Sequence, residues 1–338
     1  MYPGVLVPLL VPLASWPVAR WLAPRLAPQH GARLLTFLAV VFAAGSTCAL
    51  ALGTVAGLSL VPAVAEFGDF SPASLSAIAG SDMPLAIACG VLLIGAVVAL
   101  GRTASGHWRW YRRVHAELDE YSSDGGVVVL PGADPVAFAI AGRGGRIAVS
   151  TGMLSALSAD ERAALLHHER AHLRLRHPRY SAAGVLAGAL NPFVRPLTTA
   201  ARFAMERWAD EAAATGVGNR RVVATAVAKA ALADRRPASY ALAAGGGPVP
   251  RRVRALLDDA PPSLGVRGRG LTAVAVAVVL AGAAWSAGAG AQAAITLHSD
   301  IEAAQLASCA AHPVLAKRPH GQASLTAVRQ DRRECAEG

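Results

Sequence analysis

Long stretches without a charged side chain constrain the fold of this chain more than any other feature. Residues 34–61, 83–101 and 271–290 contain no charge, and each is long enough to cross about 30 Å of hydrocarbon. Residues 2–19 are just long enough but contain four prolines. This stretch lacks the basic start and cleavage site of a signal peptide, so we expect a retained helix. With 54% apolar and 16% charged residues, the composition agrees with a membrane protein of four spans.

The distribution of arginine predicts how these spans are oriented. The connection after the first span holds three arginines and no acid, whereas residues 63–82 hold three acids and no base. Arginines also follow the third span and precede the fourth, so both flanks of the intervening segment are predicted to be cytoplasmic. The predicted organisation is three spans in residues 1–101, a cytoplasmic domain in 102–268, a fourth span in 269–290 and a short extracytoplasmic tail in 291–338.

The same placement explains the net charge of +10, because arginines beside a bilayer meet anionic headgroups. The chain has no basic, aromatic-rich recognition helix of the kind that reads bases. We therefore expect the lipid bilayer as a partner and no direct nucleic-acid binding.

The predicted cytoplasmic domain contains the pattern H-E-x-x-H at residues 168–172. Ser158 to Glu161 has the sequence of a capping box, and residues 159–174 contain no Gly or Pro, so the pattern lies on a helix. Two histidines four residues apart are about 40° apart around the helix axis and can bind one metal ion.

Each residue of this pattern has a predicted role. His168 and His172 are the candidate ligands, and Glu169 would face the water that the ion binds. His167 lies five residues from His172, about 140° around the helix, and we interpret it as a neighbour of the site.

A catalytic zinc site needs a third protein ligand. Residues 200–214 favour a helix, and Glu206 and Asp210 lie on one face of it at i and i+4. We predict that Glu206 is the third ligand and that Asp210 accepts the other N–H of a ligating histidine. The alternative is a solvated acidic face in which these acids and Glu211 pair with neighbouring arginines.

HHERAH followed by ERWAD resembles the gluzincin pattern, H-E-x-x-H with a later E-x-x-x-D. It is similar to integral membrane zinc peptidases of the beta-lactam sensor (BlaR/MecR) type and to the related CAAX prenyl protease (Ste) and HtpX types. The segments PVAFAIAG and RIAVSTGML are similar to the strand pair and lead-in that precede the motif there. The resemblance covers residues 127–257 and is specific only at the metal motifs.

The resemblance implies a role for each matching residue. Zinc would be bound by His168, His172 and Glu206, with Glu169 as the catalytic base and Asp210 behind the ligands. His177 matches a histidine that some relatives have and that does not bind zinc. We therefore expect it to contact a ligand without binding the ion itself, as for Asp210.

Short apolar runs at residues 127–130, 136–140 and 146–150 predict a small antiparallel sheet. Its edge strand could hold an extended substrate backbone, or the strands could simply cover the motif helix. Residues 181–190 are apolar but too short to cross a membrane, which predicts a buried hairpin in preference to a membrane-dipping element. The expected fold is an α-helical membrane protein with an α+β metallopeptidase domain.

Together these patterns predict a membrane-bound zinc metalloendopeptidase that cleaves protein or peptide substrates in the cytoplasm, for example a repressor. Stabilising the oxyanion would need a further donor, and His177, Arg174 and Tyr180 are the candidates. The alternative is a non-catalytic membrane scaffold or signal transducer with a structural metal site. Glu169 argues against it, since a structural site has no need of a carboxylate beside its first ligand.

The tail departs from full-length beta-lactam sensors. It contains no S-x-x-K nucleophile pattern and is too short for a large sensor domain. If it lies outside the cell, Cys309 and Cys335 could form a disulfide.

Overall fold

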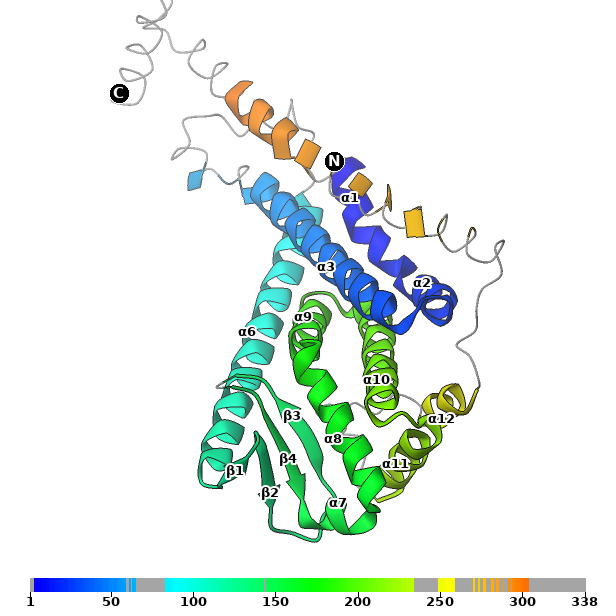
Figure 1. Ribbon diagram of the computed structural model, residues 1–338. Coiled ribbons are helices and arrows are strands. Elements are labelled where there is room, and N and C mark those ends of the chain that lie inside the picture. Colours follow the sequence, from blue (N-terminus) through cyan, green and yellow to red (C-terminus); the bar gives the residue numbers. More distant parts are fainter. Residues whose placement is uncertain are drawn as a thin grey trace, which may run out of the picture. The chain divides into compact units, whose positions relative to one another are not determined.

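The computed structural model describes residues 3–58, 83–142, 144–233 and 249–258, with a few residues between 61 and 64 and between 270 and 303 (Figure 1). The chain divides into two compact units, which we describe separately. The first comprises residues 1–10, 45–96 and 284–338, and the second residues 11–44 and 97–283.

Three segments of the described chain are long and apolar enough to cross a membrane, namely Leu6–Arg25, Pro28–Leu58 and Met83–Asp119. The predicted fourth span at 271–290 lies largely outside the described residues. Cys309, Cys335 and most of the predicted tail also lie outside them.

The first of these segments is built from short helices. They are α1 (Pro3–Leu10), the 3-10 turn η1 (Val11–Ala14), α2 (Ser15–Leu22) and the 3-10 turn η2 (Ala23–Arg25). Proline has no N–H to donate and clashes with the preceding turn, so its repeated occurrence here interrupts regular α-helix.

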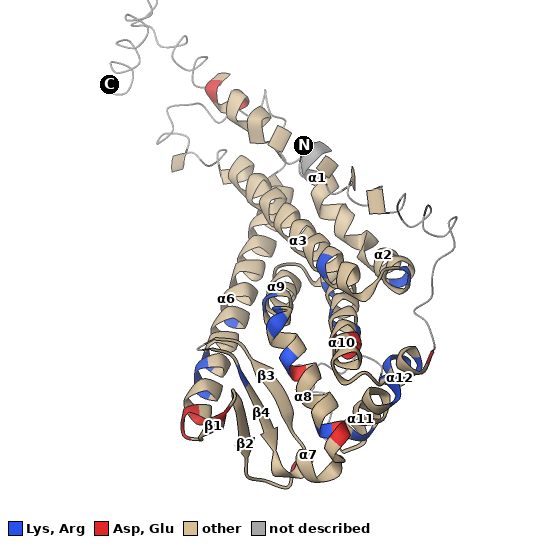
Figure 2. Cartoon of the chain, in the orientation of Figure 1, with Lys and Arg blue, Asp and Glu red and all other residues tan. Residues whose placement is uncertain are grey.

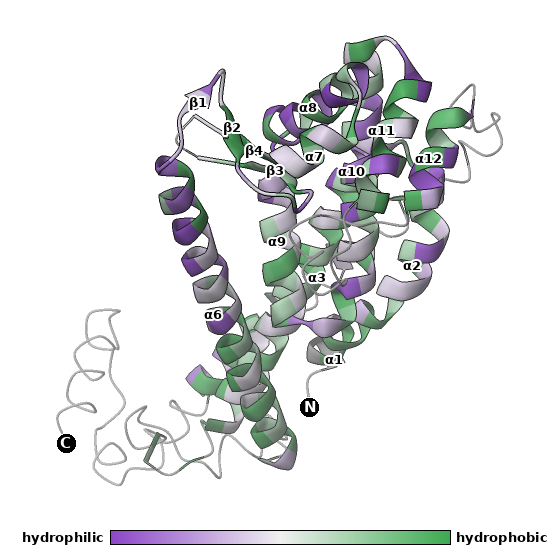
Figure 3. Cartoon of the chain, turned by 90° about the horizontal axis from the view of Figure 1, so that it is seen from below, coloured by the Kyte–Doolittle hydropathy of each residue, from purple (hydrophilic) through white to green (hydrophobic). Residues whose placement is uncertain are grey.

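The other two segments are single helices, α3 (Pro28–Leu58) and α6 (Met83–Asp119). With 37 residues, α6 is about 55 Å long, and it continues well beyond the predicted end of the span at Gly101. Figure 3 shows its first part coloured as hydrophobic and its last turns as mostly hydrophilic. Tyr111, Val114 and Leu118 from these last turns pack against the sheet.

Within the first unit, α3 and α6 approach each other closely at glycines. A Cβ placed on Gly57 would lie 2.1 Å from Cβ of Ala86, and one on Gly53 would lie 2.7 Å from Sγ of Cys89. The pattern G-x-x-x-G allows such contact between helices in lipid. Cys89 is thus a buried packing residue, whereas Cys48, which lies in α3, is exposed.

The sheet contains β1 (Ser123–Asp124), β2 (Val127–Leu130), β3 (Ala137–Ile140) and β4 (Arg146–Ser150) in the order β1-β2-β4-β3. The predicted runs for β2 and β4 are confirmed to the residue, but the prediction of an antiparallel sheet is wrong. β2 and β4 are parallel, and β1–β2 and β3–β4 are antiparallel.

The loop between β2 and β3 explains this mixed topology. It crosses the end of β4, where the Ser150 hydroxyl accepts the N–H of Val136 and the Thr151 hydroxyl accepts the N–H of Gly132. β4, whose side chains are the most buried of the four strands, thereby lies between β2 and β3. β3 is left at the edge.

Six further helices complete the second unit: α7 (Thr151–Ala156), α8 (Ala159–Arg174), α9 (His177–Leu190), α10 (Arg195–Val217), α11 (Arg220–Ala233) and α12 (Val249–Leu257). A 3-10 turn, η3 (Pro192–Val194), connects α9 to α10. Figure 1 shows α8 beside the sheet and α10 beside α8. α8, α10 and α11 pack through small side chains such as Ala164, Ala213 and Ala224, which allow close approach.

Candidate metal centre

Helix α8 is capped as its sequence predicts. The Ser158 hydroxyl accepts the N–H of Glu161, and the Glu161 carboxylate accepts the N–H of Ser158 at 2.8 Å. The helix then continues to Arg174 without interruption. His168 and His172 therefore lie one turn apart, and their Nε2 atoms are 3.0 Å from each other.

Helix α10 brings a carboxylate to the same point. Oε2 of Glu206 lies 3.5 Å from Nε2 of His168, and Oε1 lies 3.7 Å from Nε2 of His172. Donor atoms bound to a tetrahedral ion at about 2.0–2.1 Å are about 3.3 Å apart. The three observed separations match this spacing, so His168, His172 and Glu206 form a group that can hold a metal ion.

His167 lies outside this group. A Cβ on Gly216 would be 2.5 Å from its Nδ1, so the ring of His167 packs against the C-terminal part of α10. Glycine at position 216 leaves the space that this ring occupies.

The surroundings favour the ligating forms of His172 and Glu206. Burial lowers the pKa of His172 to about 4, so the ring is neutral near pH 7. Burial by itself would raise the pKa of Glu206, but the neighbouring histidines and Arg252 lower it to about 2. A neutral imidazole and a carboxylate are the forms in which these side chains bind metal.

His168 shows that the pocket attracts positive charge. Burial disfavours its imidazolium form, yet the carboxylates of Asp210 and Glu206 raise its pKa to about 10. Nδ1 of His168 lies 3.0 Å from Oδ1 of Asp210, whereas Nε2 is the nitrogen near Glu206. A cation bound at Nε2 would replace the proton that these carboxylates hold on the ring, which fits a metal site.

Arg252 on α12 completes the group and was missed by the sequence analysis. Its Nε and Nη2 donate to the two oxygens of Asp210 at 2.8 and 2.7 Å, and its Nη1 lies 3.1 Å from Oε2 of Glu206. Both Arg252 and Asp210 are buried. Arg252 is one of the arginines that precede the predicted fourth span, and that position alone does not indicate a role in this site.

A signal for Arg252 does exist in the sequence. Arg252 shares one helix face with Val249, Val253 and Leu256, at spacings of three and four residues. An arginine on an otherwise apolar face indicates a buried charge that needs an acidic partner.

His177 lies behind His172. Its Nδ1 is 2.9 Å from Nδ1 of His172, the ring nitrogen that does not face Glu206. The His177 ring is buried beside Trp208, and the guanidinium of Arg33 lies 5.0 Å from the centre of the Trp208 ring. Contacts therefore continue from the beginning of α3 to a candidate ligand.

The other two candidate oxyanion donors have different surroundings. Arg174 is exposed at the end of α8, and Tyr180 packs with Ala32 and Met205. The structure describes both side chains, and neither forms a hydrogen bond or ion pair with His168, His172 or Glu206.

Glu169 is buried on α8, next to the ligand group in sequence. Burial raises its pKa to about 7, and nearby charges on His168, Glu206 and Arg252 also act on it. The backbone of Ala139 on the edge strand β3 opposes part of this rise in pKa. A carboxyl with a pKa near 7 can both accept and release a proton at neutral pH.

Comparison with known protein families matches residues 115–319, more than half of the chain, to Peptidase family M48. No curated protein and no solved structure matches the chain. The matched range contains the sheet, His168 and His172 of the motif, Glu206 and Arg252. With a His/His/Glu group able to hold a metal and a buried glutamate beside it, this chain belongs to peptidase family M48.

Proposed function

We propose that this protein is a membrane-bound zinc metalloendopeptidase that hydrolyses peptide bonds of protein substrates at the cytoplasmic side. The observation that carries this proposal is the convergence of His168, His172 and Glu206 on one point, with Glu169 buried beside them. Two nitrogens and one carboxylate leave a fourth position of a tetrahedral zinc ion for water. The likeness to the BlaR/MecR, Ste and HtpX types suggests an integral membrane peptidase acting on proteins.

A bound zinc ion would lower the pKa of a coordinated water towards 7 and polarise the scissile carbonyl. Glu169 takes a proton from the attacking water and delivers it to the leaving amine. Asp210 holds His168 in the tautomer that presents Nε2, and His177 does the same for His172. Arg252 keeps Asp210 and Glu206 ionised and in place.

The edge strand β3 is the proposed site for the substrate backbone. One side of β3 pairs with β4, and the backbone of Ala139 on β3 is close enough to Glu169 to affect the pKa of its carboxyl. An extended peptide that lies along such a strand would have its scissile bond close to the catalytic carboxylate.

Arginine placement supports the proposed orientation. Figure 2 shows the basic residues of α6 only in its C-terminal part, and these follow the apolar run of the span. By the positive-inside rule this end is cytoplasmic. A cytoplasmic repressor is one substrate that this orientation would allow.

The test compares purified full-length protein with Glu169→Gln. The wild type should contain one zinc per chain and cut an unstructured protein substrate, and Glu169→Gln should keep zinc and lose cleavage because an amide cannot accept the proton. Glu120→Gln, at an exposed position, is the matched control and should behave as wild type.

Other outcomes would reject specific parts of the proposal. Full zinc retention in Glu206→Ala would remove Glu206 as a ligand. Undiminished cleavage by Glu169→Gln would remove Glu169 as the base. Zinc binding without any cleavage, combined with normal signalling in cells, would favour the non-catalytic scaffold.

A further inference from the structure

The connection between the two metal-binding helices forms an apolar hairpin, residues 181–201, made of most of α9, η3 and the first turns of α10. It contains one charged residue, Arg195. The helical segments on either side of it, α8 and the rest of α10, carry several charges each.

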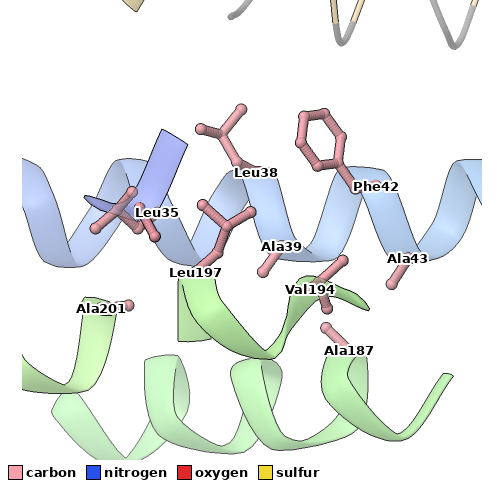
Figure 4. Packing of buried hydrophobic residues seen from close by; sticks show 10 residues of the cluster. Leu35, Leu38, Ala39, Phe42, Ala43, Ala187, Val194, Leu197 and Ala201 are labelled. Atoms are coloured by element: carbon pink, nitrogen blue, oxygen red, sulfur yellow. The ribbon is translucent and has the colours of Figure 1, made fainter. Parts of the chain in front are cut away.

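The 181–201 hairpin packs along the apolar part of α3. Leu38 and Phe42 of α3 form one buried cluster with Val194 and Leu197 of the hairpin. Figure 4 shows Leu197 near Leu35 and Val194 near Ala43. α3 is a candidate membrane span whose uncharged run begins at Leu34, so its contact with the hairpin extends about 14 Å along the span from that point.

The tip of the 181–201 hairpin also exposes apolar side chains. Phe193 is 59% exposed, and Val185 is exposed on the preceding helix. A single exposed phenylalanine is common on protein surfaces. Phe193, however, lies at the end of an uncharged segment that packs alongside the candidate membrane span α3. Lipid acyl chains would cover these side chains without cost.

The backbone of the tip suits an apolar solvent. Asn191 is buried, its side-chain oxygen accepts the N–H of Phe193, and its carbonyl accepts the N–H of Val194. Its own N–H binds the carbonyl of Ala187. A turn inside a bilayer must satisfy these groups internally, because lipid tails offer no hydrogen bonds.

Arg195 sets the depth to which the tip can enter. Its side-chain stem lies over α9, with Cγ 3.5 Å from the position of a Cβ on Gly188, away from the tip. A long basic side chain with this direction can bury its methylenes and keep its guanidinium among lipid phosphates. The guanidinium can therefore stay at the headgroup level while the tip enters the leaflet.

We propose that the 181–201 hairpin is a membrane-inserted element. Phe193 enters the acyl region of the leaflet that the beginning of α3 enters, and Arg195 binds the phospholipid headgroups of that leaflet. Glu206 follows Arg195, the first residue of α10, by 11 residues, about 17 Å along the helix, so insertion would set the height of the metal centre above the bilayer. The occupant of the exposed apolar tip is thus the lipid bilayer.

The test uses the full chain in phosphatidylcholine–phosphatidylglycerol nanodiscs, with p-benzoyl-phenylalanine replacing Phe193. Irradiation should attach phospholipid at this position, detected by mass spectrometry of the protein. Val91, exposed on the span α6, is the positive reference. Leu232, an exposed leucine on α11 far along the chain from the hairpin, is the matched negative reference. Lipid adducts at 193 should approach those at 91 and exceed those at 232 by at least about tenfold.

Two results would overturn the proposal. An adduct yield at 193 equal to that at 232 would place the tip in water. A crosslink from 193 to a second copy of the chain, without lipid adducts, would make the tip an interface between protein molecules. Zinc content and cleavage measured on the same samples separate this outcome from failure of the proposed peptidase activity.

Discussion

The two halves of α10 are held in place by different physical interactions. The first half packs against α3 through apolar side chains such as Leu197 and Ala201. The second half has apolar contacts through Ala213 and Ala214, but it also meets α8 and α12 through the buried carboxylates of Glu206 and Asp210. Loss of an apolar contact costs free energy in proportion to the cavity left, whereas loss of one buried charge leaves its partner unpaired in the interior. The comparison predicts that the polar half tolerates substitution far less well.

Arg252→Ala should have the largest effect. It leaves Glu206 and Asp210 buried without their cation, and we expect the free energy of unfolding to fall by about 3–5 kcal/mol in the metal-free protein. Zinc should recover part of this loss by supplying positive charge at the same carboxylates. Thermal or denaturant unfolding, with and without chelator, measures both effects.

Arg254 on the same helix is exposed and provides the control. Arg254→Ala should change the stability by less than about 0.5 kcal/mol. If the two substitutions reduced the stability equally, the buried charges around the second half of α10 would be no more sensitive to substitution than an exposed surface.

Leu197→Ala should have an intermediate effect. Leu197 is completely buried between α10 and α3. We expect the free energy of unfolding to fall by about 2 kcal/mol, which is the cost of the cavity that the smaller side chain leaves. The transfer of the leucine side chain adds little if the region lies in lipid, because lipid is as apolar as the protein interior. Leu197→Met, which nearly conserves volume, should cost less than about 1.5 kcal/mol. Zinc affinity should be unchanged in both, and a large loss of affinity would mean that the two halves of α10 are coupled.

Lys229→Ala should have the smallest effect. It removes a charged partner that is partly exposed, so comparison with Arg252→Ala shows how much of the effect depends on burial. Lys229 pairs with Glu161 at 2.7 Å, but its side chain is 47% exposed, unlike that of Arg252. Such a pair contributes less than about 1 kcal/mol.

This contribution should also depend on pH in a defined direction. The hydrogen bond from Lys229 lowers the pKa of Glu161 in the folded protein. The stabilisation is therefore complete above the ordinary glutamate pKa of about 4.3 and is lost as the pH falls through the lower folded value. A difference between wild type and Lys229→Ala that grows on acidification would contradict this assignment.

The metal motif and the strands were predictable because their geometry is local. A capped helix without Gly or Pro places His168 and His172 one turn apart whatever surrounds it, and the predicted limits of β2 and β4 agree with the structure. The strand order was not predictable from the runs alone. It depends on where the loop between β2 and β3 crosses, and hydrogen bonds to Ser150 and Thr151 hold that loop.

The sequence by itself determined the apolar segments, the motif helix and the residue types able to bind a metal, because these follow from helix periodicity and side-chain chemistry. Only the tertiary structure decided which charges meet. Arg252 pairs with Asp210 across 42 residues, and His177 contacts Trp208 as well as His172. Such contacts depend on how α8, α10 and α12 pack, and that packing is set by many small buried side chains acting together. The number of residues between two positions in the sequence does not determine how far apart they lie in the folded protein.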